Sequence, residues 1–312
     1  MKSAVHDHGE HTRMRPRLSV VMPSFNQGKF LEDAIRSVLD QSYENLEYIV
    51  VDGGSTDESL DILQAYGPQL THWVSEPDKG QYDAINKGFA RTTGDIMAWL
   101  NSDDKYMPWT LSLVADIFAA FPHVEWLTSV RPVLWNEQGQ PTKIDCTGGI
   151  SRRSFAKGGN FSGKRSFGRR WIQQESTFWR RSLWERSGAR LDTNYPLAAD
   201  FELWARLFQH ADLYGVDAIL GGFRMHGDQR SVLQHERYLQ ECEQILVRNG
   251  HWPCSLAESL LRGGLWTMLR PWSLTLPPSP FDRMLTAMGL LYPAPIVAWS
   301  GNNWELTTGF SL

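Results

Sequence analysis

Apolar residues follow two alternating patterns along the first 120 or so positions of the chain. A short continuous run at 18–22, "LSVVM", precedes residues 30–42, in which apolar positions recur every three or four residues. The first pattern is typical of a buried strand and the second of an amphipathic helix. The same pair recurs with candidate strands at 46–51, 71–75 and 95–100, followed by helices that begin near residue 58 and at 82–91 and 109–121. This alternation predicts an α/β fold with a mostly parallel central sheet and helices on both faces.

The pattern is less regular beyond residue 124. We expect a hairpin around "NEQGQ", a helix at 197–210, one or two strands within 213–226, and a helix at 232–248. From there the chain is rich in Trp, Leu and Pro. The predicted organisation is therefore a disordered tail at 1–16, an α/β domain at 17–232 and a helical C-terminal extension at 233–312.

Composition narrows the class of protein. Hydrophobic residues make up 42% and charged residues 21% of the chain, as in soluble globular proteins, and the net charge of -4 gives no reason to expect a nucleic-acid partner. The three cysteines match no metal-ligand spacing, which favours free thiols in a reducing, cytoplasmic compartment. No apolar stretch is long enough for a spanning helix, and the first 16 residues lack the apolar core of a secretory signal.

A polar loop follows each of the four predicted strands, and three of these loops contain glycine. They read "PSFNQG", "DGGSTD", "EPDKGQYD" and "NSDD". Open α/β sheets bind ligands beyond the carboxyl ends of their strands, so these loops are candidates for one shared site. Magnesium and manganese prefer one or two carboxylates together with phosphate oxygens, which the "NSDD" loop and a nucleotide could supply. The alternative is that these acids cap the next helix.

Two nucleotide-binding signatures are missing from the sequence. A dinucleotide fingerprint G-x-G-x-x-G does not follow any predicted strand, and the phosphate-binding motif G-x-x-x-x-G-K-[ST] is also absent. Nicotinamide or flavin enzymes and P-loop kinases are therefore disfavoured.

Two long segments carry a family resemblance. "SVVMPSFNQGKFLEDAIRSVLDQSYENLEYIVVDGGSTDES" and "EPDKGQYDAINKGFARTTGDIMAWLNSDD" resemble, in this order, the GT-A domain of family 2 inverting glycosyltransferases. The resemblance is close over residues 18–106 and weaker to residue 231. It implies a GT-A-like domain at 17–232, a nucleotide sugar as donor and a divalent cation, Mg²⁺ or Mn²⁺, as cofactor.

The resemblance also implies which residues bind the donor. They lie in the four loops and are Pro23, Ser24, Asn26, Asp52, Asp78, Lys79, Ser102, Asp103 and Asp104. The family's D-x-D signature falls on residues 101–103, with Asn101 in place of the first acid, so Asp103 is the expected metal ligand. His226, in "FRMHGDQRS", is a second candidate ligand or a structural histidine.

The catalytic base is expected in "AADFELWARL". Asp200 resembles the family's base, Ala199 replaces the preceding Glu, and Glu202 is the rival carboxylate. In an inverting transfer the base accepts the proton of the acceptor hydroxyl, while the cation stabilises the departing diphosphate. Gln174 and Glu175, in "IQQEST", resemble a segment on the acceptor side, although a structural role is an equal alternative.

Two further segments have open interpretations. Residues 151–170 carry seven basic residues and no acid, and form either a mobile lid over a phosphorylated ligand or a solvated face. The C-terminal aromatic residues either pack on the core or contact a membrane interface. Nucleic-acid binding through the basic loop is a third, disfavoured possibility.

The sequence thus predicts an inverting glycosyltransferase that acts in polysaccharide or glycolipid biosynthesis on the cytoplasmic side, with a carbohydrate or glycolipid acceptor. The alternatives are a nucleotidyltransferase, which shares a similar sheet and acidic site, and a non-catalytic carbohydrate-binding protein of the same fold, which Asn101 and Ala199 would favour.

Overall fold

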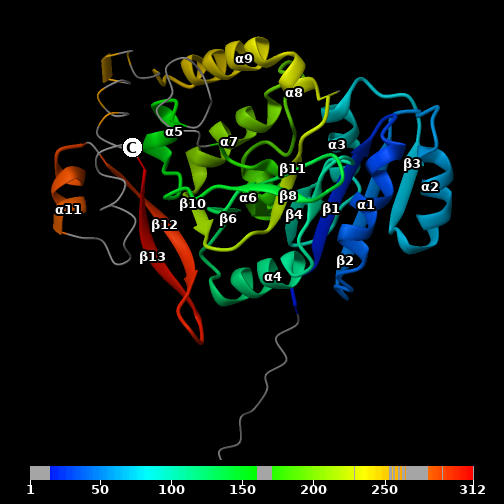
Figure 1. Ribbon diagram of the computed structural model, residues 1–312, viewed down its shortest axis with the longest axis horizontal. Helices are drawn as coiled ribbons and strands as arrows, with labels where there is room; N and C mark the ends of the chain where they lie inside the picture. The colour runs from blue at the N-terminus through cyan, green and yellow to red at the C-terminus, as the bar shows by residue number, and fades with distance from the viewer. Residues whose placement is uncertain are drawn as a thin grey trace, which may run out of the picture.

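The computed structural model describes residues 15–159, 171–227, 229–252, 255, 257–258, 261, 264, 280–289 and 291–311. Its centre is a nine-stranded sheet (Figure 1). In spatial order the strands are β13 (Trp304–Ser311), β12 (Tyr292–Trp299), β10 (Leu213–Val216), β6 (Trp126–Ser129), β9 (Phe178–Arg180), β4 (Ile96–Trp99), β1 (Leu18–Ser24), β2 (Leu46–Asp52) and β3 (His72–Ser75).

Most strand pairs in this sheet are parallel, as the sequence predicts. β1 runs parallel to β2 and β4, β2 to β3, and β10 to β6 and β12. β9 is antiparallel to both of its neighbours, and β13 is antiparallel to β12. A smaller sheet has the order β5 (Lys105–Tyr106), β11 (Gly221–Arg224), β7 (Val133–Trp135) and β8 (Pro141–Ile144). β7 and β8 pair antiparallel and form the expected hairpin.

Helices cover both faces of the main sheet, because successive strand residues point to opposite sides. Val20 and Met22 of β1 pack in the core beneath α1 (Gly28–Leu39) and α4 (Thr110–Ala120), whereas Val21 packs in the core beneath α3 (Gln81–Phe89) and α7 (Ala199–His210). The other helices are α2 (Ser59–Tyr66), α5 (Arg152–Ala156), α6 (Arg181–Arg186), α8 (Arg230–Leu233), α9 (His235–Arg248) and α11 (Pro280–Ala287), with single 3-10 turns η1 (Gly67–Gln69) and η2 (Gln174–Ser176).

A cluster of buried tryptophans fixes α7 on the sheet. The ring of Trp204 on α7 stacks on Trp99 of β4 at 5.9 Å and on Trp126 of β6 at 5.7 Å between ring centroids. Trp179 of β9 meets Trp99 edge-on at 5.6 Å. Aromatic pairs in these arrangements add about 0.5–1.5 kcal/mol each beyond the burial of their area. The helix on which Asp200 lies is therefore firmly held.

The prediction of a helical C-terminal extension is wrong for residues 292–311. Residues 292–311 form β12 and β13, and β12 pairs with β10, so this hairpin lengthens the main sheet (Figure 1). The β-branched and aromatic residues of "IVAW" and "WELTT" favour strands, but prolines at 293 and 295 obscure the pattern. Of the C-terminal aromatic residues, Tyr292 is buried and Trp299 is exposed, while Trp266 and Trp272 lie outside the described residues.

The expected mobile loop at 151–170 is only partly described. Its first residues form α5, which Ser151 caps by accepting a hydrogen bond from the backbone N–H of Ser154 at 3.2 Å. Residues 160–170 lie outside the described residues, as do residues 1–14 of the expected tail. Within the described parts of the chain, we find no helix with the length and apolar character needed to cross a bilayer.

Candidate active site

A cavity of about 1160 Å³ opens where the carboxyl ends of β1 and β4 meet the N-terminus of α7. It brings together most of the residues that the sequence singled out. Those that line it are Pro23, Ser24, Asp78, Ser102, Asp103, Gln174, Glu175, Asp200 and His226. Asn26, Asp52, Lys79 and Asp104 do not line this cavity.

Asp52 is fully buried at the end of β2. Its Oδ2 atom accepts hydrogen bonds from the backbone N–H groups of Gly54 and Ser55 at 3.1 and 2.9 Å, and from the hydroxyl of Ser75 at 2.7 Å. Its Oδ1 atom accepts one from the hydroxyl of Ser55 at 2.5 Å. These contacts shape the loop after β2, and a direct contact between Asp52 and a donor stays a prediction.

Asn26 and Lys79 are exposed beside the cavity. The backbone N–H of Asn26 donates to the Ser55 hydroxyl at 2.7 Å, and its side-chain oxygen accepts from the backbone N–H of Thr56 at 2.9 Å. Asn26 has a φ of 50°, a left-handed conformation that asparagine tolerates better than most residues. It therefore ties the loop after β1 to the loop after β2, and both residues stay donor-site predictions.

Asp103 and His226 contact each other in the wall of the cavity. The Nε2 atom of His226 lies 3.0 Å from the Oδ2 atom of Asp103, and the imidazole packs on the ring of Phe30 with 4.7 Å between centroids. The side chain of His226 is 3% exposed and that of Asp103 is 19% exposed. Over the described chain, no group of three or more His, Cys, Asp or Glu side chains is arranged to hold a metal ion. Asp103 and His226 are therefore candidate ligands as a pair and not as part of a larger described cluster.

Asp104 is fully buried next to Asp103 and does not line the cavity. Its carboxyl accepts hydrogen bonds from the backbone N–H of Arg224 at 2.8 Å and from the amide of Asn101 at 3.1 Å. Burial raises the pKa of the Asp104 carboxyl well above its usual range, and the charges of Asp103 and Glu175 raise it further. Asp104 therefore joins the loop after β4 to β11, and a direct contact between Asp104 and a donor stays a prediction.

The hydrogen bonds of Asn101 account for an amide in place of the first acid of the D-x-D signature. Its amide nitrogen donates to Asp104 and, at 3.3 Å, to the side chain of Gln174, while its oxygen accepts from Gln81 at 2.6 Å. A carboxylate at this position would have no proton to donate to Asp104 and would place a further negative charge beside it. The amide thus fits a site where acids are already crowded.

Gln174 and Glu175 line the cavity. The amide of Gln174 donates to the carbonyl oxygen of Trp99 at 2.6 Å, which fixes η2 against β4. Burial raises the pKa of Glu175 to about 7. A carboxyl whose pKa is raised in this way can donate a hydrogen bond when protonated and accept one when ionised.

Asp200 is the second residue of α7 and lines the same cavity as the Asp103–His226 pair. Burial raises the pKa of Asp200 to about 6. Its Oδ1 atom accepts a hydrogen bond from the neighbouring backbone N–H of Phe201 at 2.8 Å. A buried carboxylate with this pKa is ionised at neutral pH and has raised basicity, as a general base requires.

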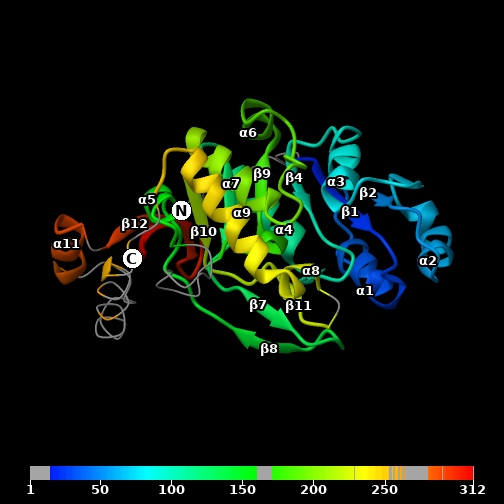
Figure 2. The ribbon, with the colours of Figure 1, turned by 90° about the horizontal axis from the view of Figure 1, so that it is seen from above.

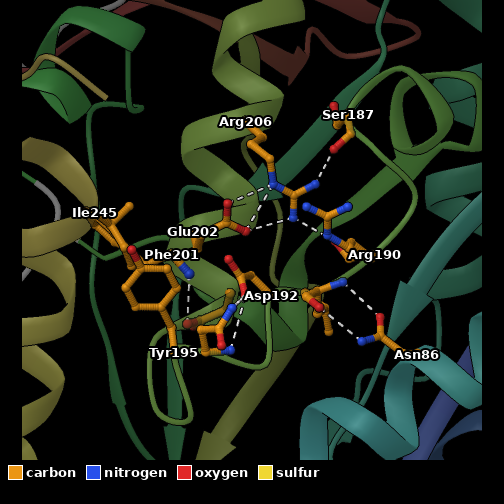
Figure 3. Close-up of polar contacts among 12 residues, drawn as sticks. Asn86, Ser187, Arg190, Asp192, Tyr195, Phe201, Glu202, Arg206 and Ile245 are labelled. Carbon is orange, nitrogen blue, oxygen red and sulfur yellow. Dashed lines mark hydrogen bonds and ion pairs between the residues drawn. The ribbon is translucent and has the colours of Figure 1, made fainter. Parts of the chain in front are cut away.

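Glu202, the rival carboxylate, does not line the cavity. Figure 3 shows its side chain paired with Arg206 one turn along α7, with distances of 2.9 Å from Nε to Oε1 and 2.7 Å from Nη2 to Oε2. Arg206 in turn donates to the carbonyl oxygens of Ser187 and Arg190. Asn86 of α3 holds the same loop through the backbone of Leu191. Glu202 therefore belongs to a structural network, which favours Asp200 as the base.

The sequence patterns did not identify several of the residues that line the cavity. Tyr82, Trp99, Trp171, Arg230, His235 and Tyr238 all line the cavity. The last two lie on α9, within the segment that we expected to be a separate extension. Isolated aromatic and basic residues at these spacings resemble core or surface positions, so only the tertiary structure reveals them.

Comparison with known proteins agrees with this geometry. Residues 19–164 match the model of the family described as Glycosyl transferase family 2. An uncharacterized glycosyltransferase of Nostoc sp. is 36% identical over 105 residues, which cover 33% of each chain. A PGL/p-HBAD biosynthesis glycosyltransferase of Mycobacterium bovis is 29% identical over 262 residues, which cover 79% of this chain and 94% of the relative. The chain spans about a third of the length of the first curated relatives it matches.

A solved structure shares the fold. The mannosyltransferase PcManGT from Pyrobaculum calidifontis superposes with a TM-score of 0.57 at 18% identity, covering 89% of this chain and 81% of that one. The matched domain, the mostly parallel sheet and the loops around the cavity lead to one conclusion. Residues 19–164 thus have the sequence pattern of glycosyltransferase family 2, and the fold of the chain is GT-A.

Proposed function

We propose that the protein is an inverting glycosyltransferase that moves a sugar from a nucleotide-diphosphate donor to an acceptor hydroxyl. The observation that carries this proposal is that Asp200 lines the same cavity as Asp103 and His226. One carboxylate is thereby available to an acceptor, and a separate acid and imidazole are available to a diphosphate. Direct displacement at the anomeric carbon needs these two functions on opposite sides of the sugar.

The loops at the strand ends form the proposed donor site. Pro23, Ser24, Asp78 and Ser102 line the cavity on the side of β1 to β4. This is the edge at which open α/β sheets bind nucleotides. The structure of PcManGT was solved in complex with GDP-Man and Mn²⁺, which supports a nucleotide sugar as the donor class here.

Asp103 and His226 fit a divalent cation that a nucleotide helps to bind. Magnesium and manganese sites often use one or two protein ligands, with phosphate oxygens and water completing the shell. Asp103 supplies a carboxylate and His226 an imidazole 3.0 Å away, whereas Asp104 is committed to Arg224 and Asn101. When bound, Mg²⁺ or Mn²⁺ would stabilise the negative charge that develops on the leaving diphosphate.

Asp200 has the proposed role of general base. The ionised carboxylate accepts the proton of the acceptor hydroxyl as its oxygen attacks the anomeric carbon. The bond from that carbon to the diphosphate breaks on the other side, and the electron pair leaves with the diphosphate. The pKa of about 6 keeps Asp200 ionised at neutral pH and close to the range in which general bases are effective.

Glycan biosynthesis is the proposed process, with a carbohydrate or glycolipid as acceptor. The Mycobacterium bovis relative is named for PGL/p-HBAD biosynthesis. Gln174 and Glu175 line the cavity and are the proposed acceptor contacts, although Gln174 also supports β4. Glu175 can donate or accept a hydrogen bond to a sugar hydroxyl at neutral pH, because burial raises its pKa to about 7.

A donor screen tests the proposal. UDP-, GDP- and dTDP-sugars are added with and without Mn²⁺ in a thermal-shift assay, because a ligand of the native state raises the melting point. Nucleotide sugars that bind are then assayed for release of nucleoside diphosphate. Pyrophosphate release from a nucleoside triphosphate would instead support a nucleotidyltransferase. Binding of a sugar without any release or transfer would support a non-catalytic carbohydrate-binding protein.

A further inference from the structure

The helix that carries Asp200 begins without a cap of its own. Its N-cap residue is Ala198, which has no side-chain oxygen. In a capping box, a Glu at the third helical position also accepts a hydrogen bond from the backbone N–H of the N-cap. Phe201 occupies that position here. Asp200 accepts from the backbone N–H of Phe201, but the N–H groups of Leu197 and Ala198, directly before the helix, need an acceptor from elsewhere in the chain.

Glu241 of α9 supplies this acceptor. Its Oε2 atom accepts from the backbone N–H groups of Leu197 at 2.9 Å and of Ala198 at 3.1 Å. The residue is 6% exposed, and its other oxygen lies 3.3 Å from Nε of Arg237. A buried carboxylate is stable only when such partners satisfy it, and a negative charge is favoured at a helix N-terminus. The contact thus supplies to the N–H of Ala198 the acceptor that a capping box would provide, and it also binds the N–H of Leu197.

The same backbone is held from a second direction. The hydroxyl of Tyr82 on α3 donates to the carbonyl oxygen of Leu197 at 3.0 Å. α9 lies across α7 in Figure 2, and Cys242, Ile245 and Leu246 of α9 join the core that contains Trp204. The segment that leads into Asp200 is therefore fixed by α3 on one side and by α9 on the other.

We propose that Glu241 is a positioning residue for sugar transfer: its carboxylate fixes the backbone from which Asp200 projects into the cavity. This inference rests on the proposed role of Asp200 as general base. α9 lies beyond residues 19–164, the part that matches the family model, so a helix from outside that part contributes to catalysis. Displacement of a catalytic group by about 1 Å can lower the rate by roughly 100-fold.

The inference differs from a purely structural role in what it predicts for kinetics. If Glu241 only stabilised the fold, its removal would lower the melting temperature without changing kcat under conditions where the protein is folded. If it positions Asp200, kcat falls while the KM for the donor stays the same, because the donor site lies at the ends of β1 to β4. This separation of kcat from KM is the deciding measurement.

The experiment compares Glu241→Ala and Glu241→Gln with a control, Glu243→Ala. Glu243 is exposed on the same helix and is removed from the turn that leads into α7. Nucleoside diphosphate release from a bound nucleotide sugar is measured at a temperature where circular dichroism finds every variant folded. Glu241→Ala should lower kcat by roughly 10- to 100-fold. Its donor KM should change by less than about twofold, as for a group that acts only in the transition state.

The glutamine variant keeps one side-chain oxygen, and a single oxygen accepts both backbone hydrogen bonds in the wild type. Glu241→Gln should therefore restore kcat to within about threefold of the wild-type value. If Glu241→Ala does not fold, Glu241→Asp takes its place, because the shorter side chain keeps the charge but withdraws the acceptor. This variant should lower kcat with an unchanged donor KM.

Several outcomes would overturn the inference. The first is a wild-type kcat in Glu241→Ala, or in Glu241→Asp if the alanine variant does not fold. The second is an equal loss of kcat in the alanine and glutamine variants. Asp200→Asn is measured in parallel to separate the two proposals. If Asp200→Asn keeps full activity, the proposed base is wrong; if it is inactive while Glu241→Ala is normal, only the positioning role is wrong.

Discussion

The Nε2 atom of His226 lies 3.0 Å from the Oδ2 atom of Asp103, although the two residues are 123 positions apart in the sequence. The contact joins the loop after β4 to the segment after β11. Arg224, two residues before His226, strengthens the same junction, because its guanidinium Nε donates to the carbonyl oxygen of Asp103 at 2.6 Å. The acid and the imidazole are therefore held together before any ligand binds.

This pair predicts a dependence on divalent cations. Treatment with a chelator should abolish nucleoside diphosphate release, and added Mn²⁺ or Mg²⁺ should restore it. Asp103→Asn and His226→Ala should each raise the half-saturating Mn²⁺ concentration by roughly 10- to 100-fold. Asp61→Asn, a change at an exposed acid of α2, is the control. Full activity in the presence of the chelator would contradict the proposed cation site.

The pKa of Asp200 predicts the acidic limb of the pH profile. A general base must be ionised, and burial raises the pKa of this carboxyl to about 6. The value of kcat/KM for the donor should therefore be nearly constant above about pH 7 and should fall about tenfold per pH unit well below pH 6. A profile that stays flat down to about pH 4.5 would show that no group with this pKa acts as the base.

The same pKa shift predicts a change in stability. The folded state binds the proton of Asp200 more tightly than the unfolded state, so the contribution of this group to the free energy of unfolding falls as pH rises from about 4 to 6. Asp200→Asn removes the buried charge. Its free energy of unfolding should exceed the wild-type value by up to about 3 kcal/mol near pH 8, and by much less near pH 4.5. Urea denaturation at both pH values measures this difference, and an equal effect at the two would contradict it.

The Glu202–Arg206 pair predicts a loss of stability without a loss of catalysis. The side chains are 12% and 18% exposed, and Arg206 also binds two backbone carbonyl oxygens of the loop at 187–190. Glu202→Ala should lower the free energy of unfolding by about 1–3 kcal/mol. Its kcat should remain within about threefold of the wild-type value, because Glu202 does not line the cavity. A loss of kcat as large as that of Asp200→Asn would make Glu202 the better candidate for the base.

The sequence predicted the parts of the site that depend on local pattern. Polar loops at the ends of parallel strands converge on one edge for topological reasons, so Ser24, Asp78 and Asp103 could be placed together before the structure was known. Asp52 belongs to the same pattern, but its hydrogen bonds to Ser55 and Ser75 depend on the detailed path of the loop. A strand-end acid that binds a ligand and one that shapes a loop have the same sequence signature.

Other parts depend on contacts between distant segments, which a single sequence does not contain. Glu241 and Tyr238 lie on a helix whose apolar pattern predicts a buried face but not its partner. The pairing of β12 with β10 is likewise a tertiary contact, between residues about 80 positions apart. The C-terminal segment was therefore expected to be separate, although α9 lines the cavity and β12 extends the sheet.

The most direct test of the proposed mechanism is nucleoside diphosphate release by the wild type and by Asp200→Asn, with a nucleotide sugar that both bind. We expect the wild type to turn over and the variant to bind the donor equally well while its kcat falls at least about 100-fold, the effect of losing a general base. Equal turnover by the two proteins would contradict the central claim that Asp200 is the base of a glycosyl transfer.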